Sequence, residues 1–244
     1  GHVAVVPVRP PPHNHVSVDL MRDLAEALEA IDGEIALRCS VLQSEGKNFC
    51  AGADLVRSES AGGLGAVNPL YDQAVRLFSA KKPMVAAVQG AAVGAGLGLA
   101  VMADFRIASP DARFAANFVK LGFHPGFGLT HTLPRLIGPA KAELMFLTGR
   151  RVKAEEGLPW GLVDEVVPLE ALRPAALRLA AEIAENAPLA IVSTRKTMRG
   201  DLAAAVRAQT DVEAAEQGWL RDTEDYKEGV RSVTERRPGN FVGR

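Results

Sequence analysis

The feature that most constrains this chain is one long stretch without charge. Residues 82–104 read KPMVAAVQGAAVGAGLGLAVMAD, and no charged side chain lies between Lys82 and Asp104. The apolar run 83–89 predicts a buried strand, and 94–102 predicts a helix that opens on glycine. A buried strand that leads through a glycine turn into an apolar helix favours an α/β fold.

A second stretch, KNFCAGADL at 47–55, places another loop of Gly and Ala directly after an expected strand. Small residues let the backbone approach a ligand closely and expose its N–H groups. A helix N-terminus adds positive partial charge at the same place. Two such amides can meet at one oxygen and form an oxyanion hole for a thioester carbonyl. The spacing alone fits simple tight packing equally well.

The rest of the chain continues the alternation of strand and helix. Ser17 is the expected N-cap and Gly33 the expected C-terminal cap of an early helix, whose Leu20, Leu24, Leu28 and Ile31 recur at helical spacing. The alternating residues Ile35, Leu37, Cys39 and Val41 predict a half-buried strand. Further strands are expected at 2–8 and 105–108, and a further helix at 68–80.

From about residue 169 the chain is rich in Ala, Leu, Glu and Arg at helical spacing. Successive helices are expected there, with Pro188, Gly200 and Gly218 between them. We therefore expect an α/β core over 1–180 and a helical region over 181–244.

Composition excludes several classes of protein. A net charge of −1 over 244 residues gives no electrostatic footprint for nucleic acid or for an anionic membrane. No apolar run approaches the length of a membrane span. Cys39 and Cys50 form no zinc pattern, and the sequence holds no P-loop. The expectation is a cytoplasmic protein with free thiols, no metal and no nucleic-acid or membrane partner.

The order of motifs resembles the enoyl-CoA hydratase/isomerase (crotonase) family over essentially the whole chain. The segments that carry the resemblance are PPPHNHVS, NFCAGADL, KPMVAAVQGAAVGAGLGLAVMADFRIAS, FAANFVKLGFHPGFGLTHTLPRLIG, LTGRRVKAEEGLPWGLVDEVVP and DYKEGVRSVTERRPGNFVG.

This resemblance implies a crotonase-like spiral of ββα units followed by a C-terminal helical trimerisation region. It also implies a homotrimer or a dimer of trimers, and acyl-CoA substrates in which coenzyme A is part of the substrate and no separate cofactor is needed. The oxyanion-hole amides then belong to Ala53 and Ala95. The implied substrate-binding residues are Asn14, His15, Val16, Ala51, Gly52, Asp54, Leu55, Gly94, Gly98, Phe118 and Gly126. Arg9, Lys47 and Lys227 are candidates for the CoA phosphates.

At three positions the chain departs from the family pattern. Hydratases that it resembles use two glutamates, and the corresponding residues here are Gly98 and Phe118. Some relatives use a carboxylate further on, and Gly126 occupies that position. Positioned acid–base groups contribute roughly 10²–10⁴ in rate each, so ordinary hydration is expected to be slow.

Few residues can replace these acids. His124 is a candidate acid or base, with a surface or packing histidine as the alternative. His131 is expected on a helix surface. Tyr71 and Asp72 lie in the region 56–75, which lines the acyl pocket in the family that the chain resembles, and a solvated helix start is the favoured interpretation for both. His13 and His15 are expected to contact the ligand or solvent rather than to act in catalysis. Cys50 is expected to be a small buried hydrophobe.

Three functions remain to be compared. The first is an acyl-CoA enzyme of the lyase or isomerase class, whose step runs through an oxyanion or enolate and differs from simple hydration. The second is a non-catalytic acyl-CoA-binding protein, which turnover of an acyl-CoA would exclude. A caseinolytic serine protease is disfavoured because neither GAGLG nor CAGAD contains a serine nucleophile.

Overall fold

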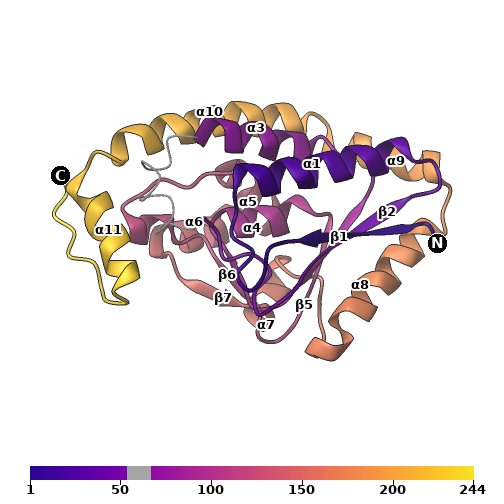
Figure 1. Cartoon of the computed structure of the whole chain (residues 1–244), viewed down its shortest axis with the longest axis horizontal. Coiled ribbons are helices and arrows are strands. Elements are labelled where there is room, and N and C mark those ends of the chain that lie inside the picture. Colours follow the sequence, from indigo (N-terminus) through magenta and orange to yellow (C-terminus); the bar gives the residue numbers. More distant parts are fainter. Residues whose placement is uncertain (54–66) are drawn as a thin grey trace.

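The computed structural model describes residues 1–53 and 67–244, and within them the predicted α/β fold is confirmed (Figure 1). Asp54 and Leu55, two of the predicted substrate-binding residues, lie outside the described residues. The main sheet is parallel, with strand order β1-β2-β3-β5-β8. Its strands are β1 (Val3–Val8), β2 (Cys39–Ser44), β3 (Met84–Val88), β5 (Phe105–Ala108) and β8 (Glu165–Val166).

A second sheet, in the order β4-β6-β7, lies beside the glycine loops. Its strands are β4 (Ala91–Val93), β6 (Arg113–Ala115) and β7 (Arg151–Lys153). Strand β4 pairs in parallel with β6, and β6 pairs antiparallel with β7. The short β4 links β3 of the main sheet to the helix that begins at Ala95. The turn at residue 94 therefore follows directly on a strand of the second sheet.

The helices connect and cover these sheets. They are α1 (Val18–Gly33), α3 (Val67–Phe78), α4 (Ala95–Met102), α5 (Leu129–Ile137), α6 (Pro139–Thr148), α7 (Ala154–Gly157), α8 (Leu169–Ala184), α9 (Pro188–Arg199), α10 (Leu202–Leu220) and α11 (Glu224–Thr234). Two short 3₁₀ helices are η1 (Asn117–Leu121) and η2 (Leu158–Trp160).

Two apolar cores lie on opposite faces of the main sheet. Met84, Ala86 and Val88 of β3 enter the larger core, while Val85 and Ala87 pack with α8. This alternation is the period-two pattern of a strand that is buried on both faces. Helices α1, α3 and α10 run side by side over the larger core, and α8 lies below the sheet (Figure 1).

Several local predictions are confirmed. Ser17 caps α1 by accepting a hydrogen bond from the Leu20 N–H at 3.1 Å. Strand β5 spans 105–108 as predicted, and Gly200 ends α9 in a backbone conformation with φ +57°.

Four other predictions need correction. Strand β2 begins at Cys39 rather than at residue 35, and it is buried on both faces because the larger core covers one face of the sheet and α8 covers the other. Gly33 is the last residue of α1, and Glu34 follows it as the C-cap. Gly218 lies within α10 rather than between helices. The expected boundary at residue 180 falls inside α8, which packs against the main sheet.

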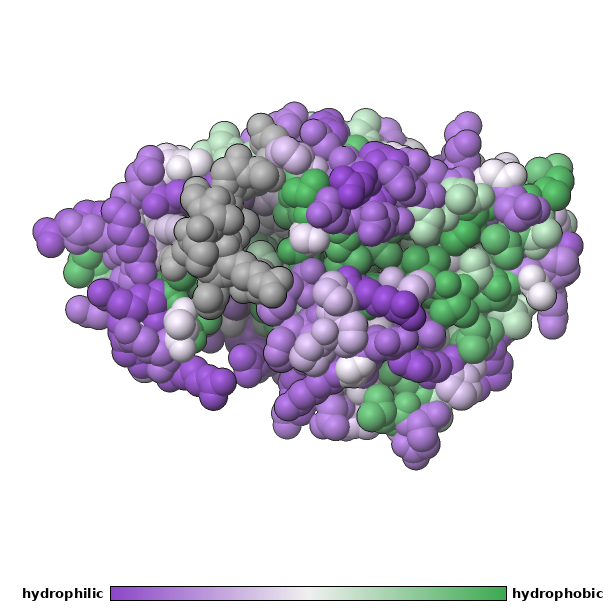
Figure 2. Space-filling model, in the orientation of Figure 1, coloured by the Kyte–Doolittle hydropathy of each residue, from purple (hydrophilic) through white to green (hydrophobic). Residues whose placement is uncertain are grey.

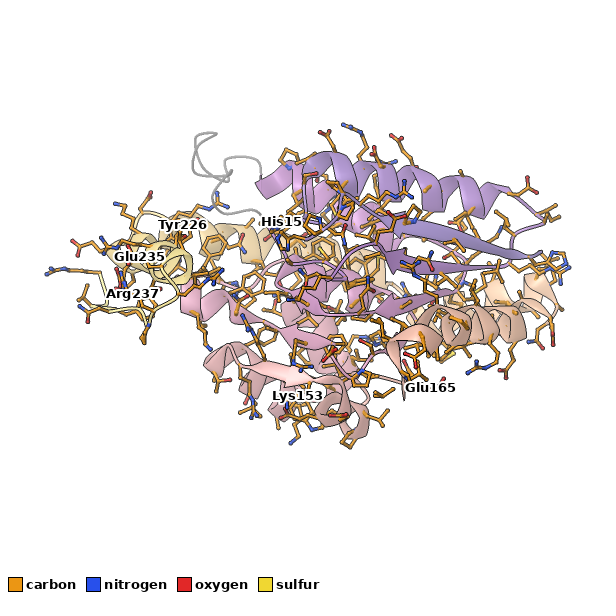
Figure 3. The ribbon with its side chains drawn as sticks, turned by 60° about the horizontal axis from the view of Figure 1, so that its bottom comes forward. His15, Lys153, Glu165, Tyr226, Glu235 and Arg237 are labelled. Carbon is orange, nitrogen blue, oxygen red and sulfur yellow. The ribbon has the colours of Figure 1, made fainter. Side chains whose placement is uncertain are left out.

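The C-terminal residues 237–243 are hydrogen-bonded to side chains of α11. Glu228 accepts hydrogen bonds from Arg237 and from the Asn240 N–H, the latter at 2.9 Å. Figure 3 shows Tyr226, Glu235 and Arg237 together at this end of the molecule, far from Lys153 and Glu165. In the described ranges 1–53 and 67–244, no helix combines the length and apolar character of a membrane span.

Candidate functional site

The two glycine loops lie directly against each other. The Cys50 N–H donates to the Ala91 carbonyl at 2.9 Å, and the Val93 N–H donates to the Cys50 carbonyl at 3.1 Å. A Cβ on Gly96 would lie 2.2 Å from the Cys50 carbonyl oxygen. Only glycine permits this approach, so the sequence GAG at 94–96 is what allows the contact. We call residues 50–53 and 91–96 the loop pair.

The first loop is also held from its other side. The Val16 N–H donates to the Gly52 carbonyl at 2.9 Å, and the Ala51 N–H donates to the His13 carbonyl at 3.0 Å. Val16 and Ala53 form a parallel bridge. Gly52 has φ +85°, and a Cβ there would lie 2.8 Å from the Val93 carbonyl oxygen. The predicted residues Val16, Ala51, Gly52 and Ala53 therefore lie in one hydrogen-bonded strip.

The second loop opens helix α4. Gly94 is its N-cap, with φ +57° and no side chain to cap the helix. The Gly94 N–H donates to the Ala115 carbonyl at 2.9 Å, which ties the turn to β6. Ala95 is the first residue of α4, where backbone N–H groups have no partner within the helix. Each loop is thus held next to its predicted residue, at Gly52 before Ala53 and at Gly94 before Ala95.

The aromatic ring of Phe118 lies beside this turn. A Cβ placed on Gly94 would lie 3.7 Å from Phe118 Cζ. Phe118 is half-buried on η1 and packs against the larger core. An apolar ring therefore borders the start of α4 where the resemblance implies a glutamate.

The space at Gly98 is filled by the fully buried Phe127. A Cβ on Gly98 would lie 2.3 Å from Phe127 Cδ1. Phe127 has φ +66°, a left-handed conformation that costs a non-glycine residue about 1–2 kcal/mol. Sequence reasoning missed this residue, although its position between Gly126 and Gly128 is a local signal for an unusual turn.

The space at Gly126 is filled by Tyr71 of α3. A Cβ on Gly126 would lie 1.9 Å from the Tyr71 hydroxyl oxygen. Tyr71 is buried, so its expected place at a solvated helix start is wrong. Its hydroxyl donates to Gln217 Oε1 at 2.8 Å, and burial raises its pKa well above the usual value. Asp72 is exposed and pairs with Arg207 at 2.7 Å.

Tyr71, Phe118 and Phe127 together form what we call the wall. Each side chain lies at one glycine: Phe118 at Gly94 of the loop pair, Phe127 at Gly98 of α4 and Tyr71 at Gly126. The three residues come from α3, η1 and the segment before α5. A side chain at Gly98 or at Gly126 would therefore meet an aromatic residue.

Three further residues predicted for the site are His124, His15 and Asn14. His124 is half-buried, with Nδ1 2.7 Å from the Pro125 carbonyl oxygen. His15 lies in the middle of the molecule in Figure 3, with Nδ1 3.1 Å from the Gly52 carbonyl oxygen. Asn14 is fully buried, and its Nδ2 donates to the carbonyls of Glu45 and Asn48 at 2.9 and 2.8 Å. Asn14 thus holds the turn that precedes the first loop.

Two smaller predictions concern His131 and Cys50. His131 lies on α5, as predicted, but is half-buried. Cys50 is buried, and burial raises its thiol pKa to about 12. Within residues 1–53 and 67–244, no group of three or more His, Cys, Asp or Glu side chains is placed to hold a metal ion.

Comparisons with known proteins indicate one family over the full length of the chain. A family model described as enoyl-CoA hydratase/isomerase matches residues 1–244. The (E)-benzylidenesuccinyl-CoA hydratase of Thauera aromatica is 37% identical over 249 residues, covering 100% of this chain and 96% of that protein. The crotonyl-CoA hydratase of Syntrophomonas wolfei is 33% identical over 240 residues, covering 97% and 92%.

A solved structure of an enoyl-CoA hydratase/isomerase from Pseudoalteromonas atlantica T6c superposes with a TM-score of 0.89 at 28% identity, covering 99% of this chain and 96% of that one. The predicted crotonase-type α/β fold is therefore confirmed. The chain belongs to the enoyl-CoA hydratase/isomerase family.

Proposed function

We propose that the protein is an enzyme on acyl-CoA thioesters and that the N–H groups of Ala53 and Ala95 bind the thioester oxygen. The observation that supports this proposal is the loop pair, whose backbone hydrogen bonds hold Gly52 and Gly94, the residues directly before Ala53 and Ala95. A donor of this kind contributes roughly 10²–10³ in kcat, because it stabilises the charge that develops on the oxygen. Relatives named as hydratases of CoA thioesters support the substrate class.

The wall supports a reaction other than simple hydration. Water addition needs a proton donor and a base near the β-carbon. Phe118 and Phe127 bring apolar rings to the family positions of the two glutamates, and Tyr71 keeps its hydroxyl bonded to Gln217. We propose an isomerisation, hydrolysis, decarboxylation or C–C cleavage through an enolate or oxyanion, with His124 as the candidate acid or base.

We propose that the substrate contacts the hydrogen-bonded strip around the first loop and the wall. Ala51, Gly52 and Val16 lie along the first loop, and Gly94, Gly98, Phe118 and Gly126 lie along the second loop and the wall. His15 is the proposed polar contact beside Gly52. Asn14 is proposed to act through the turn that it holds, since its side chain has no exposed surface.

Crotonyl-CoA hydration tests the reaction type, followed by the loss of enoyl-thioester absorbance. The matched variant introduces glutamates at both family positions, as Phe118→Glu and Gly98→Glu. It also carries Phe127→Gly, because a side chain at position 98 needs the space of the Phe127 ring. We expect a rate far below that of ordinary hydratases from the parent and a gain from the variant. Fast hydration by the parent would refute the divergent reaction.

A panel of acyl-CoA thioesters separates an enzyme from a binding protein. We expect turnover of at least one thioester, with loss of activity in an Ala95→Pro variant that has no N–H at this position. Thioester binding without turnover across the panel would leave an acyl-CoA-binding protein instead. The control is the wild-type chain, measured at the same concentration with the thioesters and with free CoA.

We further propose that the chain forms a homotrimer or a dimer of trimers through the region 181–244. Apolar surface gathers over the end of the molecule that holds the N-terminus and α9 (Figure 2). Leu189 and Met198 of α9 are 82% and 77% exposed in the single chain. Sedimentation of the wild type and of Leu189→Asp tests this, and a monomeric wild type would contradict it.

A further inference from the structure

Two buried polar side chains of α10 are neither catalytic nor substrate-binding residues in the function proposed above. Glu213 and Gln217 lie one turn apart on the same helix face, and they are 0% and 2% exposed. Buried polar groups are retained where they find partners, so their partners indicate what they do.

Glu213 caps a helix from outside it. Its carboxylate accepts the Gly128 N–H at 2.7 Å, the Thr130 N–H at 3.0 Å and the Thr130 hydroxyl at 2.5 Å. These N–H groups belong to the start of α5, whose N-cap Gly128 has no side chain. A carboxylate suits this place because it satisfies free N–H groups and the positive end of the helix dipole.

Gln217 holds the other end of the same segment. Its Nε2 donates to the His124 carbonyl at 2.9 Å, and its Oε1 accepts from the Tyr71 hydroxyl at 2.8 Å. One amide group therefore ties the turn before α5 to helix α3.

Phe127 lies between these two attachment points. Its φ of +66° is a conformation that a non-glycine residue keeps only where the surroundings hold it. The same conformation directs its ring into the space beside Gly98. Tyr71, the second partner of Gln217, fills the space beside Gly126.

We propose that Glu213 and Gln217 are positioning residues which hold segment 124–130 and thereby set the shape of the wall. The pair fixes which acyl groups fit beside the loop pair, and the C-terminal helical region thus controls acyl specificity within its own chain. This inference rests on the proposed function, because it assumes that the acyl group lies along the wall.

The test compares Glu213→Gln and Gln217→Leu with Asp211→Asn, an exposed residue of the same helix that loses the same charge as Glu213. Calorimetry gives Kd for free CoA, acetyl-CoA, butyryl-CoA and octanoyl-CoA. We expect the octanoyl-to-acetyl ratio of Kd to shift by about tenfold in both variants, equivalent to about 1.4 kcal/mol. Free CoA binding and the Asp211→Asn control should match the wild type.

A second readout needs no ligand. Amide hydrogen exchange at Gly128 and Thr130 should be at least about tenfold faster in Glu213→Gln, because the acceptor of both N–H groups is altered. If Gln217→Leu does not fold, Gln217→Glu keeps the acceptor for Tyr71 and removes the donor to the His124 carbonyl.

The outcomes are distinguishable. Faster exchange with an unchanged acyl ratio means that the pair only stabilises the fold, and unchanged exchange means that Glu213 does not hold the segment; either result overturns the inference. Wild-type protein that binds neither CoA nor any thioester overturns the proposed function itself, which is visible before any variant is made.

Discussion

The two sides of the candidate site are built by different means. The loop pair is made of backbone contacts, in which Cys50, Val93 and Gly96 meet through carbonyl and N–H groups. The wall is made of side chains from separate elements. Gln217 of α10 bonds its member Tyr71, and Glu213 bonds Gly128, which directly follows its member Phe127. A backbone contact fixes the position of an N–H group and tolerates few residues. A side-chain wall leaves room for variation in the chemistry beside it.

Removing the ring of Phe127 should have the largest effect on stability. Phe127→Ala is expected to cost about 3–5 kcal/mol, because a fully buried ring leaves a cavity. The left-handed strain persists with alanine, so it does not offset this loss. Phe118→Ala is the control, with about 1–2 kcal/mol expected for a half-buried ring. Urea unfolding measures both, and equal costs would mean that the wall is not anchored at Phe127.

A single methyl group should disturb the loop pair almost as much. Gly96→Ala is expected to cost about 3 kcal/mol, since its Cβ would lie 2.2 Å from the Cys50 carbonyl oxygen and the backbone must move. Gly218→Ala makes the same change within α10, where a Cβ meets nothing within 4 Å. That control should gain about 0.5–1 kcal/mol from helix propensity. A tolerated Gly96→Ala would refute the close approach of the two loops.

The difference between the two sides also explains what the sequence could predict. The loop pair is encoded locally, because Gly and Ala follow apolar strands in 47–55 and 82–104. The wall is not: Gly98 and Gly126 indicate only missing acids, and the residues that fill the space come from other elements. The alternation over 35–41 was misleading for a similar reason, since layers from other parts of the chain cover both faces of β2.

Two glutamates of the C-terminal region should give opposite pH dependences of stability. Burial raises the pKa of Glu213 above its usual 4.5, so the folded state binds this proton more tightly than the unfolded chain does. Its contribution is present at low pH and decreases as pH rises above about 4.5. Hydrogen bonds from Arg237 lower the pKa of Glu228, so its contribution is present above 4.5 and is lost as pH falls.

Urea unfolding of Glu213→Gln and Glu228→Gln from about pH 3 to about pH 7, on both sides of the ordinary carboxyl pKa, measures both slopes against the wild type. The difference between wild type and variant should fall with pH for Glu213 and rise for Glu228. The same sign for both would contradict the assignment of burial to one and ion pairing to the other.

The smallest effect is expected where a loop-pair residue loses only its side chain. Cys50 holds β4 through its N–H and carbonyl, while its buried thiol makes no contribution to those two bonds. Cys50→Ala should therefore cost only about 1 kcal/mol, the value of a small cavity, and leave thioester binding unchanged. Cys39→Ala, a buried thiol of β2 away from the loops, is the control. If Cys50→Ala abolished binding at unchanged stability, the thiol itself would act on the ligand, and this half of the site would not be made by backbone alone.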